Sequence, residues 1–247
     1  MREEYDLSGN VTKEAYYDIQ GNPVILDDQG YASAERQYER GNLTRVRYFD
    51  TEGNLTLLSG KGYAIAEFSY DMDGNLVSER YLDTDGMPVI NTEYHCAGKR
   101  FAYNARGDRT DTWYCGTDGQ YMVRDDLGYA HIHSEYDEFD NECDIRFFDA
   151  EENPVPTKNG GYYGKEKYYE SGLLIRECYL DAEGKSVLNS WGYAYVAYTY
   201  NEAGQVIQMR FYDTEGIPVY SLEDHCFGYE YAYDARGNKE YTYYLNP

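Results

Sequence analysis

A tyrosine-bearing turn recurs along this chain at a fixed interval and limits the folds open to it. One copy reads Tyr70-Asp71-Met72-Asp73-Gly74-Asn75. A Gly-Tyr-Ala strand, or a variant of it, begins eight residues before the turn tyrosine. The pairs are Gly30 and Tyr38, Gly62 and Tyr70, Gly128 and Tyr136, Gly161 and Tyr169, and Gly192 and Tyr200. In two further pairs histidine replaces the glycine, and these are His95 and Tyr103, and His225 and Tyr233. A constant period indicates a repeat architecture. The sequence therefore predicts a tandem array of about seven units of about 32 residues.

The residues within one unit predict β-hairpins. Residues 62–70 and 76–82 have the composition of strands, and residues 71–75 between them form a turn in which aspartate bonds its own backbone and glycine takes a left-handed conformation. Pro88 begins a third element that we expect to be short and peripheral, because proline lacks a backbone N–H. No segment keeps a helical period. The predicted fold class is all-β, a tandem β-hairpin repeat array forming a solenoid or a spiralling antiparallel sheet.

Alternation along the first strand predicts its two faces. Ala64, Ala66 and Phe68 share one parity, which we expect to be buried, while Tyr63 and Ile65 share the other, which we expect to face outward. A single hairpin is marginally stable in water. The apolar core is therefore predicted to lie between neighbouring units.

Composition excludes several partners. Acidic residues number 45 against 22 basic ones, a net charge of −23, so nucleic acid is not an expected partner. No apolar stretch approaches the roughly 20 residues of a membrane helix, so no membrane insertion is expected. Five cysteines do not form a spaced disulfide framework. Because the sequence starts and stops within a repeat, we expect residues 1–247 to be a single repeat array excised from a longer protein.

The segment Tyr70-Asp71-Met72-Asp73-Gly74-Asn75-Leu76 resembles the YD-repeat family of bacterial surface and toxin-shell proteins and of teneurins, the rearrangement-hotspot type. The resemblance implies a spiralling antiparallel sheet with a structural or encapsulating role outside the cell. It covers the turns, since the unit here is longer and includes the Gly-Tyr-Ala strand.

A second likeness involves aromatic-Asp-x-x-Gly elements such as Tyr48-Phe49-Asp50-Thr51-Glu52-Gly53. These are similar to the hairpin repeats of choline- and glycan-binding cell-wall modules, which implies aromatic ligand pockets between adjacent hairpins. Tryptophan, which marks those modules, occurs here only at Trp113 and Trp191.

Candidate ligand-binding residues follow from columns of side chains that the repeat aligns. The candidates are the strand tyrosines Tyr63, Tyr129 and Tyr193 and the arginines Arg47, Arg80 and Arg210. Arg146 belongs to the same arginine column. Each arginine is expected either to stack on a tyrosine or to pair with a turn carboxylate of the next unit, and the stabilising role is favoured over the ligand-binding role.

Three other patterns have alternative interpretations. His131 and His133, with Glu135, share a strand face that could bind zinc, although the parity places this face outward, where histidines are usually solvated. Asp71 and Asp73 could form part of a calcium loop, but plain turn chemistry is favoured because no closing glutamate follows. The neighbours in His95-Cys96 and in His225-Cys226 point to opposite faces of a strand, which disfavours a thiolate nucleophile and favours duplication of a four-unit block.

No known catalytic motif occurs in the chain. The sequence predicts a non-enzymatic repeat module of a larger bacterial surface protein, extracellular or at the cell surface, without cofactor, that acts as a spacer and binds a glycan or another protein through tyrosine-lined grooves between units. The alternative is a purely structural shell or stalk without ligand. A third possibility is an enzyme with its site on the face of residues 129–136, for which His133→Ala would abolish activity.

Overall fold

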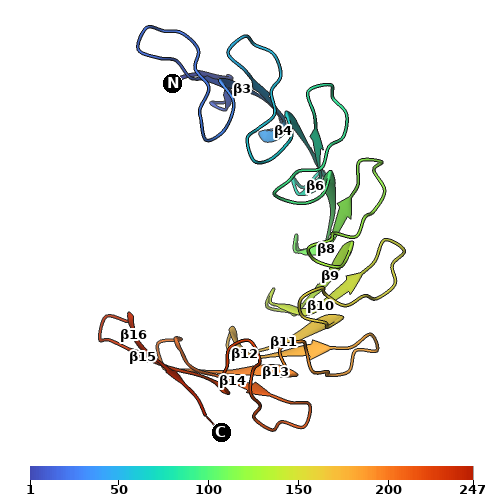
Figure 1. Ribbon diagram of the computed structural model, residues 1–247, viewed down its shortest axis with the longest axis vertical. Coiled ribbons are helices and arrows are strands. Elements are labelled where there is room, and N and C mark those ends of the chain that lie inside the picture. The colour runs from blue at the N-terminus through green and yellow to red at the C-terminus, as the bar shows by residue number, and fades with distance from the viewer. Residues whose placement is uncertain (247) are drawn as a thin grey trace. The chain divides into compact units, whose positions relative to one another are not determined.

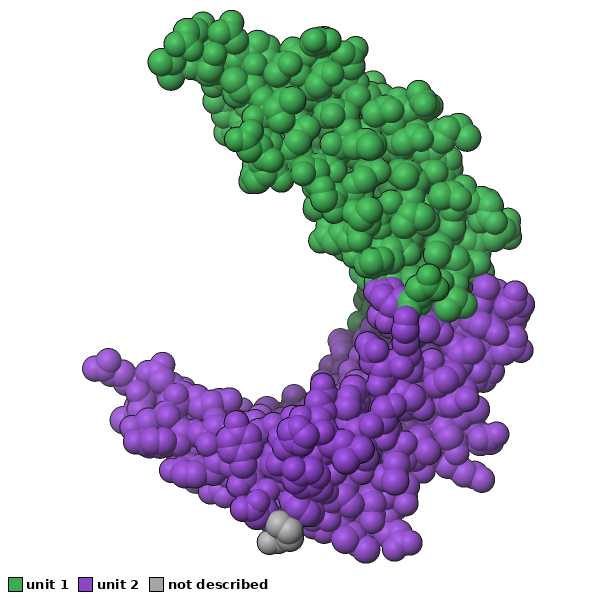
Figure 2. All heavy atoms as spheres, in the orientation of Figure 1, with its two compact units in different colours: residues 1–125 green, residues 126–247 purple. Residues whose placement is uncertain are grey.

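The computed structural model describes residues 1–246 and separates them into two compact units, unit 1 of residues 1–125 and unit 2 from residue 126 onward (Figure 2). The regular elements of the described residues are all β-strands, and these residues include no helix long and apolar enough to cross a membrane.

Each unit contains four consecutive hairpins (Figure 1). The strands of unit 1 are β1 (Arg2–Tyr5), β2 (Val11–Ala15), β3 (Ser33–Glu39), β4 (Asn42–Phe49), β5 (Ile65–Tyr70), β6 (Leu76–Leu82), β7 (Gly98–Tyr103) and β8 (Arg109–Cys115). Those of unit 2 are β9 (His131–Tyr136), β10 (Glu142–Phe148), β11 (Gly164–Glu170), β12 (Leu173–Leu180), β13 (Tyr195–Tyr200), β14 (Val206–Tyr212), β15 (Gly228–Tyr233) and β16 (Lys239–Tyr244).

Within each unit every strand pairs antiparallel with the next one in the chain. The all-β hairpin array predicted from the repeat is confirmed. The seven repeats predicted from the sequence correspond to the hairpins from β3 to β16, and the hairpin of β1 and β2 is an eighth.

The hairpin turns have the predicted chemistry. Asp71 Oδ1 accepts hydrogen bonds from the amides of Asp73 at 3.0 Å and Asn75 at 2.8 Å, and Asn75 Nδ2 donates to Asp71 Oδ2 at 3.0 Å. Gly74 has a φ of 89°, and the strand register shifts between Ser69 and Tyr70, as a bulge requires. The predicted third strand is confirmed as short, for it consists of single bridges such as Leu82 with Pro88.

After each bridge the chain forms a capping loop, which leads into the next hairpin and lies over one face of the sheet. In the loop of residues 58–62 the amide of Leu58 donates to the carbonyl of Tyr63 at 2.7 Å. Successive loops are joined by single backbone hydrogen bonds; these run from the amides of Ser59, Thr92, Lys158, Ser190 and Leu222 to the carbonyls of Gln29, Lys61, Leu127, Gly160 and Trp191. The loops thus form a second ladder beside the strands.

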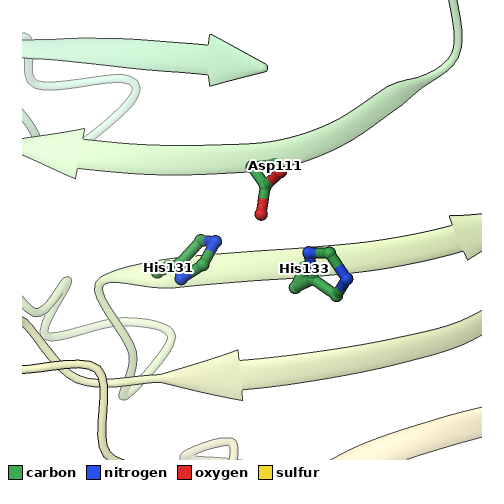
Figure 3. A group of neighbouring side chains, drawn as sticks. All are labelled: Asp111, His131 and His133. Carbon is green, nitrogen blue, oxygen red and sulfur yellow. The ribbon is translucent and has the colours of Figure 1, made fainter. Parts of the chain in front are cut away.

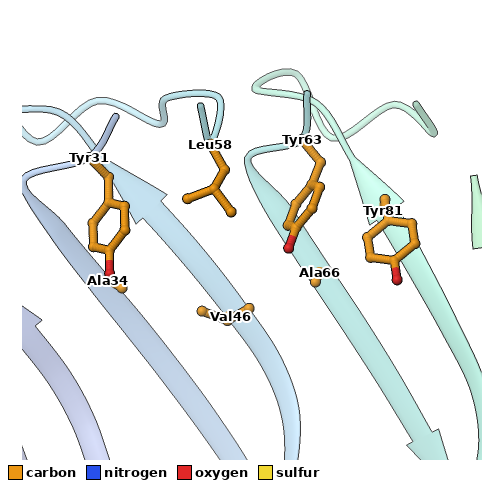
Figure 4. Packing of buried hydrophobic residues seen from close by; sticks show 7 residues of the cluster. All are labelled: Tyr31, Ala34, Val46, Leu58, Tyr63, Ala66 and Tyr81. Atoms are coloured by element: carbon orange, nitrogen blue, oxygen red, sulfur yellow. The ribbon is translucent and has the colours of Figure 1, made fainter. Parts of the chain in front are cut away.

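Aromatic rings fill the space between the capping loops and the sheet, on the side that we call the ladder face. In unit 1 consecutive ring centroids of Tyr16, Tyr31, Tyr48, Tyr63, Tyr81 and Tyr94 lie 4.9 to 6.1 Å apart. Figure 4 shows Leu58 between Tyr31 and Tyr63, pointing toward Val46 on the sheet. In unit 2 the series is Tyr129, Phe147, Tyr162, Tyr179, Tyr193, Phe211 and Tyr229. The core lies between neighbouring hairpins, as predicted.

The opposite side of the sheet, the arginine face, carries Arg47, Arg80, Arg146 and Arg210. The predicted division into one buried and one outward face is wrong at the start of the strands, because Tyr63 and Ile65 are buried together with Ala64 and Ala66. Capping loops cover the ladder face there, and the turns that follow the second strands fold over the arginine face, where Leu55 packs against Ile65 and Leu82.

Glycine occupies the start of every second hairpin from β7 onward. A Cβ atom built on Gly98 would lie 2.5 Å from the backbone oxygen of Glu79, and one on Gly164 would lie 2.6 Å from that of Ile145. The third such residue is Gly228. At these positions the neighbouring strand approaches too closely for any side chain.

Candidate functional site

An aromatic groove in unit 2 is the best candidate site. It lies on the ladder face between the capping loop of residues 157–161 and the sheet, with a volume of about 400 Å³. Ile132, Ile145 and Phe147 form its floor, and the other lining residues are Asp126, Leu127, Tyr129, Glu142, Thr157, Asn159, Gly160, Tyr162, Lys165 and Trp191. Ligand pockets in proteins are typically of this size and largely apolar.

Thr157 borders the open space, at a loop position that also holds Asn91, Asn189 and Ser221 in other repeats. Thr157 occupies the loop position that Leu58 has in unit 1, since the amides of both residues donate to the carbonyl of a ladder tyrosine, Tyr162 at 2.9 Å and Tyr63 at 2.7 Å. Leu58 is buried in the core. Thr157 is shorter, and its Oγ1 atom is buried without a hydrogen-bond partner among the described residues. The Thr157 hydroxyl is thus enclosed beside the groove and is not open to it.

Two charged groups of the groove, Lys165 and Glu142, are already paired. Lys165 Nζ lies 3.0 Å from Glu177 Oε1 and 5.5 Å from the ring centre of Tyr162. Burial lowers the pKa of Lys165, but the carboxylate of Glu177 outweighs it, so that the pKa is raised. Glu142 accepts hydrogen bonds from Lys167 Nζ at 2.6 Å and Ser134 Oγ at 2.8 Å. The groove thus suits an uncharged ligand with apolar ring faces.

The three tyrosines predicted to bind ligand belong to the series of aromatic rings on the ladder face. Tyr63, Tyr129 and Tyr193 are between 7 and 8 % exposed. Tyr129 lines the groove, Tyr63 packs with Leu58, and the ring of Tyr193 lies 4.5 Å from that of Phe211. Ligand binding by these residues stays a prediction, and their burial leaves little of each ring open to contact.

The arginines form ion pairs of a kind that the repeat alone did not predict. Arg47 pairs with Glu35 at 2.8 Å and Arg80 with Glu67 at 2.5 Å. Both carboxylates lie directly across the same hairpin, so the predicted partner, a turn carboxylate of the next unit, is wrong for these two residues. Cross-strand neighbours are closer than any turn, which explains the choice.

The remaining arginines of the column differ. Arg146 forms two hydrogen bonds of 2.7 Å with Asp144 on its own strand. Arg210 lies opposite Gly228, and its Nε atom is buried without a hydrogen-bond partner in the described part of the chain. Ligand binding by Arg47, Arg80 and Arg210 also stays a prediction.

His131 and His133 lie on strand β9 (Figure 3). The expectation that both face outward is wrong for His131, which is 5 % exposed. Its Nδ1 atom lies 2.7 Å from Glu152 Oε2, and its ring stacks on Phe148 at 5.2 Å. The turn that contains Glu152 folds over the start of β9. The turn after β4 covers Ile65 in unit 1 in the same way. Zinc binding by the two histidines stays a prediction.

The other polar patterns have structural explanations. His95 and His225 take the left-handed conformation of the glycine that they replace, with φ of 52° and 55°. Cys96 and Cys226 are buried, and burial raises the pKa of the Cys96 thiol to about 11, which disfavours the thiolate. The Asp71 carboxylate is occupied by the amides of its own turn, in agreement with the favoured turn chemistry.

Comparison with known proteins gives distant structural likeness only. No protein-family model matches the chain, and no curated protein matches it. Among solved structures, the TcdB2-TccC3-TEV crystal structure matches 96 % of this chain at 13 % identity and a TM-score of 0.39. The Photorhabdus luminescens Tc holotoxin pore with a TccC3 mutation matches 97 % at 12 % identity and a TM-score of 0.40. The chain spans 13 % of the length of each of these two chains.

Most residues of the groove are not predictable from the repeat pattern. Thr157, Ile132 and Lys165 match no recognised motif, and Trp191 stands out in the sequence only as one of two tryptophans. Aligning the capping loops places Leu26, Leu58, Asn91, Thr157, Asn189 and Ser221 at one position, and this variation alone does not single out the groove.

Proposed function

We propose that the chain is a non-enzymatic repeat module whose aromatic groove in unit 2 binds an uncharged glycan. The observation that supports this is the open groove bordered by Thr157 and lined by Tyr129, Phe147, Tyr162 and Trp191. Aromatic side chains offer flat apolar faces with polar tips, and the apolar face of a sugar ring fits such a surface. The paired state of Lys165 and Glu142 favours a ligand without charge.

The proposal places the module within a larger bacterial protein, outside the cell or on its surface, where it also acts as a spacer. The hydrogen bonds between capping loops and the series of aromatic rings support the spacer role, because within each unit they join every hairpin to the next one. They equally support a structural shell or stalk without ligand, which is the second candidate function.

Tryptophan fluorescence gives a direct test. In a Trp113→Phe variant, Trp191 at the groove is the only tryptophan, so its emission reports binding of uncharged oligosaccharides selected on a glycan array. We expect saturable binding that Thr157→Leu weakens at least tenfold, because leucine at this position fills the space as Leu58 does in unit 1. Thr157→Ser, which keeps a small side chain with a hydroxyl, should bind normally.

The melting temperature separates loss of binding from loss of fold. Thr157→Leu should melt at or above the temperature of the parent protein, since it adds apolar contacts. Absence of binding by the folded parent would leave the structural role, and undiminished binding by Thr157→Leu would place the ligand elsewhere.

A further inference from the structure

The last hairpin of unit 1 interrupts the charge pattern of the arginine face. In the two hairpins before it a glutamate lies opposite an arginine, Glu35 opposite Arg47 and Glu67 opposite Arg80. In the hairpin of β7 and β8 the same two positions hold Arg100 and Trp113. The ion pair is replaced by a cation and an aromatic ring.

Arg100 has no carboxylate partner. Its side chain is exposed and forms no ion pair among residues 1–246. The guanidinium lies 5.7 Å from the ring centre of Tyr121, and that ring stacks on Trp113 with centroids 5.9 Å apart and planes 16° apart. An unpaired guanidinium thus borders a stacked aromatic pair.

A cavity of about 470 Å³ lies beside Arg100. Gly98 lines it together with Arg80 and Cys115, its neighbours on the adjacent strands, and the turn of residues 116–119 forms one wall. The cavity lies entirely within unit 1.

The three carboxylates that line this cavity are engaged. Glu79 pairs with Lys99 at 2.7 Å. Glu67 pairs with Arg80 at 2.5 Å and with Arg45 at 3.6 Å. Asp118 Oδ1 accepts the amide of Gln120 at 3.0 Å. Among the described residues that line the cavity, Arg100 is therefore the basic group outside any ion pair, and its charge can bind a ligand.

The combination has a definite chemistry. A guanidinium binds a carboxylate through two parallel hydrogen bonds, while a stacked aromatic pair offers an apolar surface to a sugar ring. We propose that unit 1 has a second binding site, at Arg100, Trp113 and Tyr121, for a sugar that bears a carboxylate. This site is independent of the groove in unit 2 and differs from it in the charge of its ligand.

Oligogalacturonate and its methyl ester form a matched pair of probes, since esterification removes the carboxylate charge and keeps the sugar. In a Trp191→Phe variant, Trp113 is the only tryptophan, and its fluorescence reports binding at this site. We expect oligogalacturonate to bind at least tenfold more tightly than the ester. Arg100→Gln should reduce its affinity at least tenfold.

A second variant tests binding without risk to the fold. Arg100→Glu together with Trp113→Arg rebuilds the glutamate–arginine pair of the preceding hairpins and should melt like the parent protein. Isothermal titration calorimetry should then detect no oligogalacturonate. Equal binding of the ester, unchanged affinity in Arg100→Gln, or no binding by the folded parent would each overturn the proposal.

Discussion

Gly98 is the residue at which the packing of two strands is tightest in unit 1. The backbone oxygen of Glu79 leaves no room for a Cβ atom there, although the same repeat position holds Ser33 in β3 and Ile65 in β5. The approach of β6 and β7 thus depends on the absence of one side chain.

Replacing Gly98 should therefore separate two strands. Gly98→Ala requires the backbone to move, which costs about 1–3 kcal/mol in overpacked sites, and urea unfolding should show this loss. Ser33→Ala removes a hydroxyl from the equivalent position in β3 and should change the free energy of unfolding by about 0.5 kcal/mol or less. Equal stability of Gly98→Ala and the parent would show that the strands separate without cost.

At the same scale, the sequence predicted turn residues well and pocket residues poorly. The role of Asp71 follows from its own neighbours in the chain, because the groups that it bonds lie two and four residues away. The groove at Thr157 depends on contacts with residues of β9 and β10 that lie ten or more residues earlier in the chain. His131 was misplaced for the same reason, since Glu152, which covers it, belongs to another element.

Aspartates in the hairpin turns and in the turns that follow the second strands contribute to the acid sensitivity of each hairpin. The pKa values of Asp6, Asp18, Asp50, Asp71, Asp149 and Asp234 are lowered, chiefly by hydrogen bonds from the asparagine four residues later. A carboxyl with a lowered folded-state pKa stabilises the fold fully above its unfolded pKa of about 3.9. This stabilisation is lost as the pH falls through the lower folded pKa.

The melting temperature should accordingly decrease from about pH 4 downward, as circular dichroism can measure. Asn104 shows how to remove this dependence, since its Oδ1 atom accepts the amides of Arg106 and Asp108 without titrating. Replacing Asp18, Asp50 and Asp71 by asparagine should keep the turns and make the acid decrease less steep. The same acid profile in this triple variant would assign the sensitivity to other carboxylates.

At the scale of the whole molecule, contacts between strands within each unit are confined to neighbours in the chain. Such an array responds to damage locally, because stability is the sum of each repeat and its two interfaces. The fold class was predictable from the repeat for this reason. The arrangement of hairpins that are not neighbours was not predictable from the sequence, because turn residues do not encode it.

Tyr63→Ala tests this local response. Truncation of a large buried aromatic side chain costs about 3–5 kcal/mol, and hydrogen exchange followed by mass spectrometry should show lost protection in β3 to β6. Protection of β13 to β16 should be unchanged. Tyr63→Phe, which keeps the ring, serves as the control, and uniform loss of protection over the chain would show that the array unfolds as one cooperative body.

The glycine at Gly98, Gly164 and Gly228 recurs at intervals of 66 and 64 residues, twice the spacing of the turns. The smallest segment whose packing repeats is therefore a pair of hairpins. Loss or gain of one hairpin would bring a bulky side chain such as Ile65 against a strand shaped for glycine. Arrays of this kind should consequently lengthen and shorten by two hairpins at a time, and a designer extending one should copy the pair.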